Sequence, residues 1–147
     1  MPRFTHSLAF VFTSNYHEVV LIEKQRPAWQ KGFWNGLGGK VEPEETILDC
    51  VVREVEEESG IFVPDKHWTQ VAILTSPDWQ AQVYATTIQK PNHTLVSETG
   101  EKIGWFGIHR LPNVIDNIHW LIPLSQNKLE NPDLQSLIAT YDSKNRS

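Results

Sequence analysis

The chain of 147 residues contains one cysteine, Cys50, so an internal disulfide is impossible and a reducing compartment is compatible with the sequence. No apolar run reaches the length of a membrane span, and the first residues lack the pattern of a signal peptide. No histidines have zinc-ligand spacing, and no serine lies in a Gly-x-Ser-x-Gly turn. We therefore expect a cytoplasmic protein with no membrane partner, no zinc site and no serine nucleophile.

Basic residues are fewer than acidic ones, 13 against 18, which gives a formal net charge of −5. A protein that binds a nucleic acid polymer needs a basic face, so we expect no such partner. Residues 24–40 are the exception, because they contain no acid and four basic residues: Lys24, Arg26, Lys31 and Lys40. This segment favours a small anionic substrate, although any one of these side chains taken singly is better explained as ordinary surface.

Acidic residues are concentrated between residues 38 and 61, which hold eight of the eighteen. Pro43 and the acids beside it favour the first turn of a helix. Gly60 suits the left-handed position after the last turn. In between, four apolar residues fall on one arc of the helix: Leu48, Val51, Val52 and Val55. The sequence therefore predicts one long helix that packs along this arc.

Three carboxylates, of Glu54, Glu57 and Glu58, fall on the neighbouring arc of that helix. At this spacing they repel one another and raise each other's pKa unless a cation lies among them. Their hard oxygen atoms suit Mg²⁺, which binds a few carboxylates together with substrate phosphates. The segment therefore predicts a divalent metal site, and the alternative is a solvated acidic face.

The segment resembles the Nudix box: glycine, five residues, Glu, seven residues, Arg-Glu, an apolar residue, any residue, Glu-Glu, any residue, glycine and an apolar residue. Residues 39–61 fill all nine specified positions, with Gly39, Glu45, Arg53, Glu54, Val55, Glu57, Glu58, Gly60 and Ile61. On this motif the chain is identified as a member of the Nudix hydrolase family. The resemblance implies an α+β fold in which a mixed β-sheet is sandwiched between helices, as a single domain over residues 1–147.

The flanking sequence independently predicts an α+β sandwich. β-Branched and aromatic runs predict strands at 5–13, 18–23, 67–74, 80–88 and 103–108, the first two joined as a hairpin. An apolar segment predicts a helix at 118–124, and Leu134, Leu137 and Ile138 predict a short final helix. Glycines interrupt residues 32–37, so the backbone there is expected to bend or to lie close to another group.

The resemblance also implies roles for individual residues. Mg²⁺, or Mn²⁺ in its place, would be held by Gly39, Glu54, Glu57 and Glu58. Arg53 would hold the carboxylates in place, and Glu45 would support the loop. The base for the attacking water is either Glu54 or a carboxylate of a distal loop, where Glu98 and Glu101 are the candidates and Glu101 is favoured. Taken singly, each of these two residues is explained equally well as an ordinary, solvated acid of the loop.

Residues 33–41 are similar to the MutT-type branch of the family, which hydrolyses oxidised purine nucleoside triphosphates. This similarity implies that Asn35 and the pair Asp116-Asn117 contact the base. From the basic segment 24–40, Lys24 and Lys40 are expected to bind the anionic part of the substrate. An amide suits a purine edge because it both donates and accepts a hydrogen bond. Asn117 departs from the mammalian pattern, which has a second acid there, so the preferred base stays open.

Three functions are compared. The favoured one is Mg²⁺-dependent hydrolysis of a purine nucleoside triphosphate, oxidised or not, to a monophosphate and pyrophosphate. The second is hydrolysis of ADP-ribose or another nucleoside diphosphate derivative, which the Trp34-Asn35 pair opposes mildly. The third is a regulatory module without turnover, which is disfavoured because every carboxylate of the box is present. The sequence sets no oligomeric state.

Overall fold

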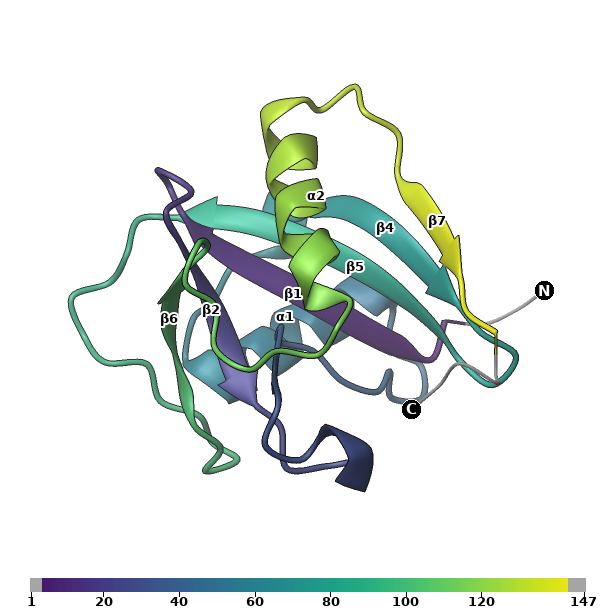
Figure 1. The fold of residues 1–147 in the computed structure, drawn as a ribbon, viewed down its shortest axis with the longest axis horizontal. Helices are drawn as coiled ribbons and strands as arrows, with labels where there is room; N and C mark the ends of the chain where they lie inside the picture. Colours follow the sequence, from purple (N-terminus) through teal and green to yellow (C-terminus); the bar gives the residue numbers. More distant parts are fainter. Residues whose placement is uncertain (1–3, 143–147) are drawn as a thin grey trace.

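The computed structural model describes residues 4–142, which form one seven-stranded sheet with a helix against each face (Figure 1). The strands are β1 (His6–Thr13), β2 (Glu18–Glu23), β3 (Trp34–Asn35), β4 (Thr69–Thr75), β5 (Gln80–Ile88), β6 (Ile103–Gly107) and β7 (Leu137–Thr140). The helices are α1 (Ile47–Ser59) and α2 (Ile118–Glu130), with short 3-10 turns at Ala28–Gln30 and Asp65–His67. Within the described residues, no helix is long and apolar enough to cross a membrane.

The sheet has the strand order β3-β2-β1-β5-β4-β7, and β6 pairs with β2 outside this path. Strands β1 and β5 run parallel, as do β4 and β7, while the other pairs are antiparallel. The predicted hairpin of the first two strands is confirmed by the antiparallel pairing of β1 with β2. The sheet is therefore mixed, as the family resemblance implies.

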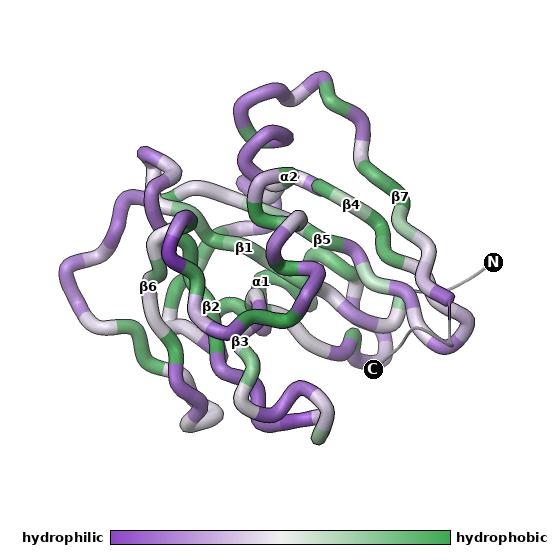
Figure 2. Tube along the Cα trace, in the orientation of Figure 1, coloured by the Kyte–Doolittle hydropathy of each residue, from purple (hydrophilic) through white to green (hydrophobic). Residues whose placement is uncertain are grey.

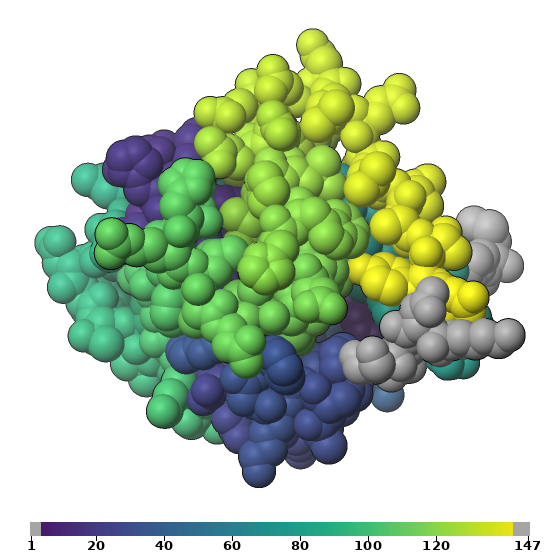
Figure 3. All heavy atoms as spheres, in the orientation of Figure 1, coloured from purple at the N-terminus to yellow at the C-terminus, as the bar shows by residue number. Residues whose placement is uncertain are grey.

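The side chains of β1 alternate between two cores, because successive residues of a strand point to opposite faces. Phe10 and Phe12 lie in the core that includes the apolar side of α2, whereas Ala9 and Val11 lie in the core that includes the apolar side of α1. Figure 2, which is coloured by hydropathy, shows hydrophobic residues along β1 and β5. Figure 3 shows the face of the molecule that α2 covers. Helices therefore cover both faces of the sheet, which confirms the predicted sandwich.

Helix α1 begins later than predicted. Thr46 caps its first turn, since its side chain accepts a hydrogen bond from the backbone N–H of Asp49 and the Asp49 carboxylate accepts one from that of Thr46. Pro43 lies in the preceding loop, where Glu44 has a φ of 65° that no helix allows. The prediction of Pro43 in the first turn is therefore wrong. The predicted end is confirmed, because Gly60 is left-handed with a φ of 79°.

The end of the described chain also differs from its prediction. Of the residues expected in a short final helix, Leu137 and Ile138 instead enter β7, which pairs in parallel with residues 72–75 of β4, and Leu134 lies in a bend before that strand. The spacing of three between Leu134 and Leu137 favoured a helix, but the available edge of β4 takes Leu137 and Ile138 into a strand. Helix α2 extends to Glu130 rather than ending at 124, because the polar residues after Leu124 include good helix formers.

Candidate active site

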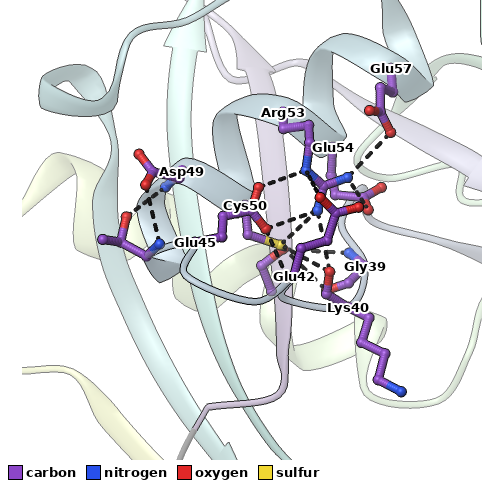
Figure 4. A network of polar contacts seen from close by, with 11 residues as sticks. Gly39, Lys40, Glu42, Glu45, Asp49, Cys50, Arg53, Glu54 and Glu57 are labelled. Atoms are coloured by element: carbon purple, nitrogen blue, oxygen red, sulfur yellow. Dashed lines mark hydrogen bonds and ion pairs between the residues drawn. The ribbon is translucent and has the colours of Figure 1, made fainter.

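Arg53 joins the loop before α1 to the acidic side of the helix (Figure 4). Its Nε and Nη2 donate to the two carboxylate oxygens of Glu45 at 2.6 and 3.0 Å. Its Nη1 donates to Glu54 at 3.0 Å and to Glu57 at 3.3 Å. The hydrogen bonds from Arg53 to Glu45 lower the pKa of the Glu45 carboxyl group. One guanidinium therefore orients three carboxylates, and we call these four residues the Arg53 cluster.

The carboxylate of Glu54 lies directly against the backbone of Gly39. A Cβ atom at position 39 would lie 2.6 Å from Glu54 Oε2, so any other residue would displace this carboxylate. The Gly39 carbonyl accepts a hydrogen bond from the backbone N–H of Ser7 at 2.9 Å, which fixes it to β1. Burial raises the pKa of Glu54, an effect that Arg53 opposes and Glu57 reinforces. Two oxygen groups predicted to bind metal are thus adjacent.

Glu58 is buried, with 4% of its surface exposed, and so does not share the open surface of α1 with Glu54 and Glu57. Its Oε1 accepts a hydrogen bond from the backbone N–H of Gly38 at 2.8 Å. Burial raises the pKa of Glu58 to about 8, with smaller opposing effects from Lys24 and the Gly38 N–H. The expectation of three carboxylates side by side on an open arc is therefore wrong for Glu58.

These donors fit a hard divalent cation. Within residues 4–142, no three His, Cys, Asp or Glu side chains converge in an arrangement ready to hold a metal ion. The carboxylates of Glu54 and Glu57 and the carbonyl of Gly39 nevertheless supply the oxygen donors that Mg²⁺ prefers, and Mg²⁺ commonly completes its shell with water and substrate phosphates. Burial raises the pKa of both Glu54 and Glu58, and a cation bound beside them would favour their charged forms.

The distal loop of residues 97–101 reaches the same end of the molecule. The backbone N–H of Glu98 donates to the carbonyl of Glu57 at 2.8 Å, while the Glu98 side chain is exposed. The Glu101 carboxylate accepts hydrogen bonds from the backbone N–H of Gln25 and the hydroxyl of Thr99, both at 3.0 Å. Both predicted base candidates are therefore close in space to the box, although they are distant from it in sequence.

A cavity of about 740 Å³ connects the predicted substrate residues, and Figure 3 shows the surface hollowed between the blue segment after β2, the start of α2 and the yellow C-terminal strand. Its lining includes five of the predicted site residues: Lys24, Asn35, Gly39, Asp116 and Asn117. Lys40 does not line it, because its side chain is exposed and points away from the Arg53 cluster (Figure 4). The cavity thus joins Asn35, Asp116 and Asn117 to Lys24 and Gly39, whereas none of the predicted carboxylates lines it: Glu54, Glu57, Glu58, Glu98 and Glu101.

Asn35 and Asn117, the two amide side chains predicted to contact the base, form different hydrogen bonds in the cavity. Asn35 Oδ1 accepts a hydrogen bond from the backbone N–H of Gly36 at 2.8 Å, and its amide nitrogen donates to Gln30 at 3.4 Å. Asn117 donates from its amide nitrogen to the hydroxyl of Tyr141 at 3.1 Å. The other amide atom, Asn117 Oδ1, is buried and has no hydrogen-bond partner among the described residues.

Several lining residues were not predicted from the sequence. They are His6, Ser7, Trp29, Phe33, Trp79 and Tyr141. Trp29 and Phe33 lie within the basic segment, so their position was a usable signal. Tyr141 gave none, because only the pairing of β7 with β4 brings it to the cavity. The predicted close approach of the backbone in residues 32–37 is confirmed, since a Cβ on Gly36 would lie 2.8 Å from a ring carbon of Phe10 and 3.0 Å from the carbonyl oxygen of Ala9.

Comparison with known proteins identifies several relatives, among them two with different named activities. NAD-capped RNA hydrolase NudC of Vibrio cholerae is 33% identical over 103 residues, which are 64% of this chain and only 35% of that protein. The oxidized purine nucleoside triphosphate hydrolase of Mus musculus is 30% identical over 115 residues, covering 74% of this chain and 73% of the relative. The chain thus spans about a third of the first relative and about three quarters of the second.

Solved structures support the fold. The MutT Nudix hydrolase of Burkholderia pseudomallei has a TM-score of 0.67 and 24% identity, covering 84% of this chain and 98% of that one. An ADP-ribose pyrophosphatase of Streptococcus suis has a TM-score of 0.68 and 21% identity, covering 94% and 99%. The sequence model of the NUDIX domain matches residues 3–125. With its complete box on α1 and the segments that flank this helix, the chain belongs to the Nudix family.

Proposed function

We propose that this protein hydrolyses a purine nucleoside triphosphate to the monophosphate and pyrophosphate in a reaction that requires Mg²⁺. The observation that carries the proposal is the shared cavity: Lys24 and Gly39, the latter against the carboxylate of Glu54, line it together with Asn35, Asp116 and Asn117. A nucleoside triphosphate carries its negative charge at one end and a hydrogen-bonding base at the other. The basic group and the hydrogen-bonding side chains of the cavity match these two parts.

At the phosphate end, Gly39, Glu54, Glu57 and Glu58 would hold the metal. When bound, Mg²⁺ would neutralise phosphate charge and favour attack by water. Arg53 keeps Glu54 and Glu57 oriented, and Lys24 supplies a positive charge on the cavity wall. The water attacks phosphorus while the bond between the α- and β-phosphates breaks and the leaving group takes its electron pair.

The proton of the attacking water needs a carboxylate acceptor. Glu54 is in place beside the backbone of Gly39, and Glu101 is in place beside the backbone of Gln25. We favour Glu101, because Glu54 is a proposed metal ligand and accepts from the charged Arg53 guanidinium at 3.0 Å, whereas the Glu101 carboxylate accepts from the neutral groups of Gln25 and Thr99. Glu98 is the further candidate, since its loop bonds to the carbonyl of Glu57. Mn²⁺ has similar donor preferences and is expected to replace Mg²⁺.

At the base end, aromatic and amide groups suit a purine. Trp29, Phe33 and Trp79 line the cavity, and its volume lies in the range of small-molecule sites. Asn35 and the Asp116-Asn117 pair add hydrogen-bonding groups. The mouse relative named as an oxidized purine nucleoside triphosphate hydrolase supports this assignment. We expect the protein to act on small nucleotides in the cytoplasm. Lys40 does not line the cavity, and we expect its positive charge to assist binding of the substrate phosphates from outside it.

A second candidate is hydrolysis of ADP-ribose. This candidate is suggested by the similarity to the ADP-ribose pyrophosphatase of Streptococcus suis, whose structure matches 94% of this chain. The decisive experiment measures product release with Mg²⁺ from ordinary and oxidised nucleoside triphosphates, ADP-ribose, dinucleoside polyphosphates and NAD-capped RNA. Purine triphosphates are expected to give the highest kcat/KM. A higher value for ADP-ribose or capped RNA would overturn the proposal, whereas no turnover of any compound would favour a binding module.

A further inference from the structure

His6 lies on the wall of the cavity and presents one unpaired ring nitrogen. Because side chains alternate along β1, His6 lies on the same face of the sheet as Leu8, and both residues line the cavity. The Nδ1 atom of His6 is 2.7 Å from Thr5 Oγ1. Its Nε2 atom has no hydrogen-bond partner within residues 4–142, and the buried side-chain atoms that lack a partner there do not include it. This nitrogen is therefore accessible to a ligand.

Thr5 holds the imidazole ring of His6 in place. The Thr5 hydroxyl lies 3.1 Å from the carbonyl oxygen of Gln80 and 3.2 Å from its backbone nitrogen. Nδ1 of His6 can accept from this hydroxyl or donate to it, so the ring hydrogen of the neutral form lies on Nε2 or on Nδ1. A phosphate oxygen only accepts hydrogen bonds, and it therefore selects the form with Nε2–H. In that form the Gln80 carbonyl still accepts from the backbone N–H of Thr5 at 2.8 Å.

Two lysines approach His6 from other segments of the chain. Lys40 lies opposite His6 in an antiparallel bridge, and residues opposite each other in such a bridge point to the same face. Lys24 lines the cavity from the segment after β2. No ion pair within residues 4–142 involves either lysine. Burial lowers the pKa of His6, and the charges of Lys40 and Lys24 lower it further. The surroundings of His6 therefore suit an anion.

We propose that His6 is a substrate-binding residue whose Nε2–H donates to the terminal phosphate, in a subsite shared with Lys24 and Lys40. Lys40 is exposed and lies outside the cavity, whereas the residues assigned to the base line it. The phosphate that reaches Lys40 is therefore the one farthest from the base. Lys24 also acts on the Glu58 carboxylate, so the subsite lies beside the proposed metal ligands. The inference rests on the proposed function and adds that the site selects triphosphates over diphosphates.

The experiment compares kcat/KM for dGTP and dGDP, which differ by the terminal phosphate. We expect the wild type to favour dGTP by about 10-fold or more, since a hydrogen bond to a charged group contributes more than one between neutral groups. His6→Leu removes the donor and is expected to reduce this ratio about 10-fold, mainly through a higher KM for dGTP. His17→Leu is the matched control, because His17 is exposed in the turn at the other end of β1. Its ratio should equal that of the wild type.

Two further variants separate the hydrogen bond from a structural effect. His6→Gln offers an amide N–H in place of the ring nitrogen, so it should keep most of the preference for dGTP. Thr5→Val keeps the shape of Thr5 but releases Nδ1, so it should lower the ratio by a smaller factor than His6→Leu does. The inference is overturned if His6→Leu lowers kcat/KM by the same factor for dGTP and dGDP, if it changes neither value, or if His6→Gln loses as much of the ratio as His6→Leu.

Failure of the inference is distinguishable from failure of the proposed function. If no triphosphate is hydrolysed, the proposed function is wrong, and titration calorimetry with inorganic tripolyphosphate and Mg²⁺ still tests the subsite. Binding that His6→Leu weakens about 10-fold, with binding of dGMP unchanged, would support the inference. Equal binding of tripolyphosphate by the wild type and His6→Leu, or no binding by the wild type, would contradict it. Neither of these two results would bear on triphosphate hydrolysis itself.

Discussion

Replacing Arg53 by methionine should destabilise the protein substantially. Methionine keeps an unbranched apolar stem but removes the guanidinium that donates to Glu45 at 2.6 and 3.0 Å and to Glu54 at 3.0 Å. Glu45, Glu54 and Glu57 would then be left together without their shared cation. The loop before α1 would also lose its main attachment to the helix.

The magnitude follows from how exposed the partners are. Breaking a fully buried ion pair costs about 3–5 kcal/mol, whereas an exposed pair contributes about 0–1 kcal/mol. The side chains of Arg53 and Glu45 are 23% and 11% exposed, which places this pair between the two limits. We therefore expect Arg53→Met to lower the free energy of unfolding by about 2–3 kcal/mol. For a chain of this size, that corresponds to a fall in Tm of about 5–10 °C.

The assay is scanning calorimetry of the protein without divalent metal. Lys90→Met is the matched control, because the Lys90–Glu18 pair has a similar distance of 2.8 Å but side chains that are 47% and 34% exposed. Its Tm should change by no more than about 3 °C. A double-mutant cycle with Glu45→Gln should show coupling of about 1–3 kcal/mol. Equal Tm changes for Arg53→Met and Lys90→Met, with no coupling, would refute the reasoning.

Three further outcomes follow. Glu57→Gln should lower kcat by at least about 100-fold with little change in Tm, since this proposed ligand is 41% exposed, while Glu56→Gln, an exposed change on the same helix, should alter neither. Mg²⁺ at about 100 times its Kd should stabilise the fold by about 2.7 kcal/mol, and an unchanged Tm at millimolar Mg²⁺ would contradict the metal assignment. Burial lowers the pKa of His6 below 6.5, and the charges of Lys40 and Lys24 lower it further. Because the unfolded chain then binds more protons than the folded one, the free energy of unfolding should fall as the pH drops below 6.5. Urea titrations at several pH values should show a weaker pH dependence for His6→Gln than for the wild type.

The sequence predicted α1 and its chemistry because both are encoded locally. The arc of Val51 and Val55 sets the buried side of the helix, and Gly60 sets its end. The start was mispredicted although Thr46 and Asp49 form a readable capping box, because the preference of proline for a first turn was given more weight. The physical lesson is that a reciprocal pair of caps outweighs a single propensity.

Contacts between distant segments could not be predicted from local pattern. The burial of Glu58 depends on the Gly38 backbone, which β1 holds in place. The final strand depends on the open edge of β4, and its residues Leu137 and Ile138 fit a helix equally well in isolation. Tyr141 enters the cavity only through that pairing. Hence the motif predicts the proposed metal-binding residues, whereas several residues that line the cavity could be found only from the structure.

The central claim is that the cavity and the box on α1 together cleave a purine nucleoside triphosphate between its α- and β-phosphates. The most direct measurement is phosphorus NMR of the products formed from dGTP and 8-oxo-dGTP with Mg²⁺, using Glu57→Gln as the inactive reference. The account predicts a nucleoside monophosphate and pyrophosphate in equal amounts, formed by the wild type alone. Release of a nucleoside diphosphate with inorganic phosphate, or equal rates in Glu57→Gln, would contradict it.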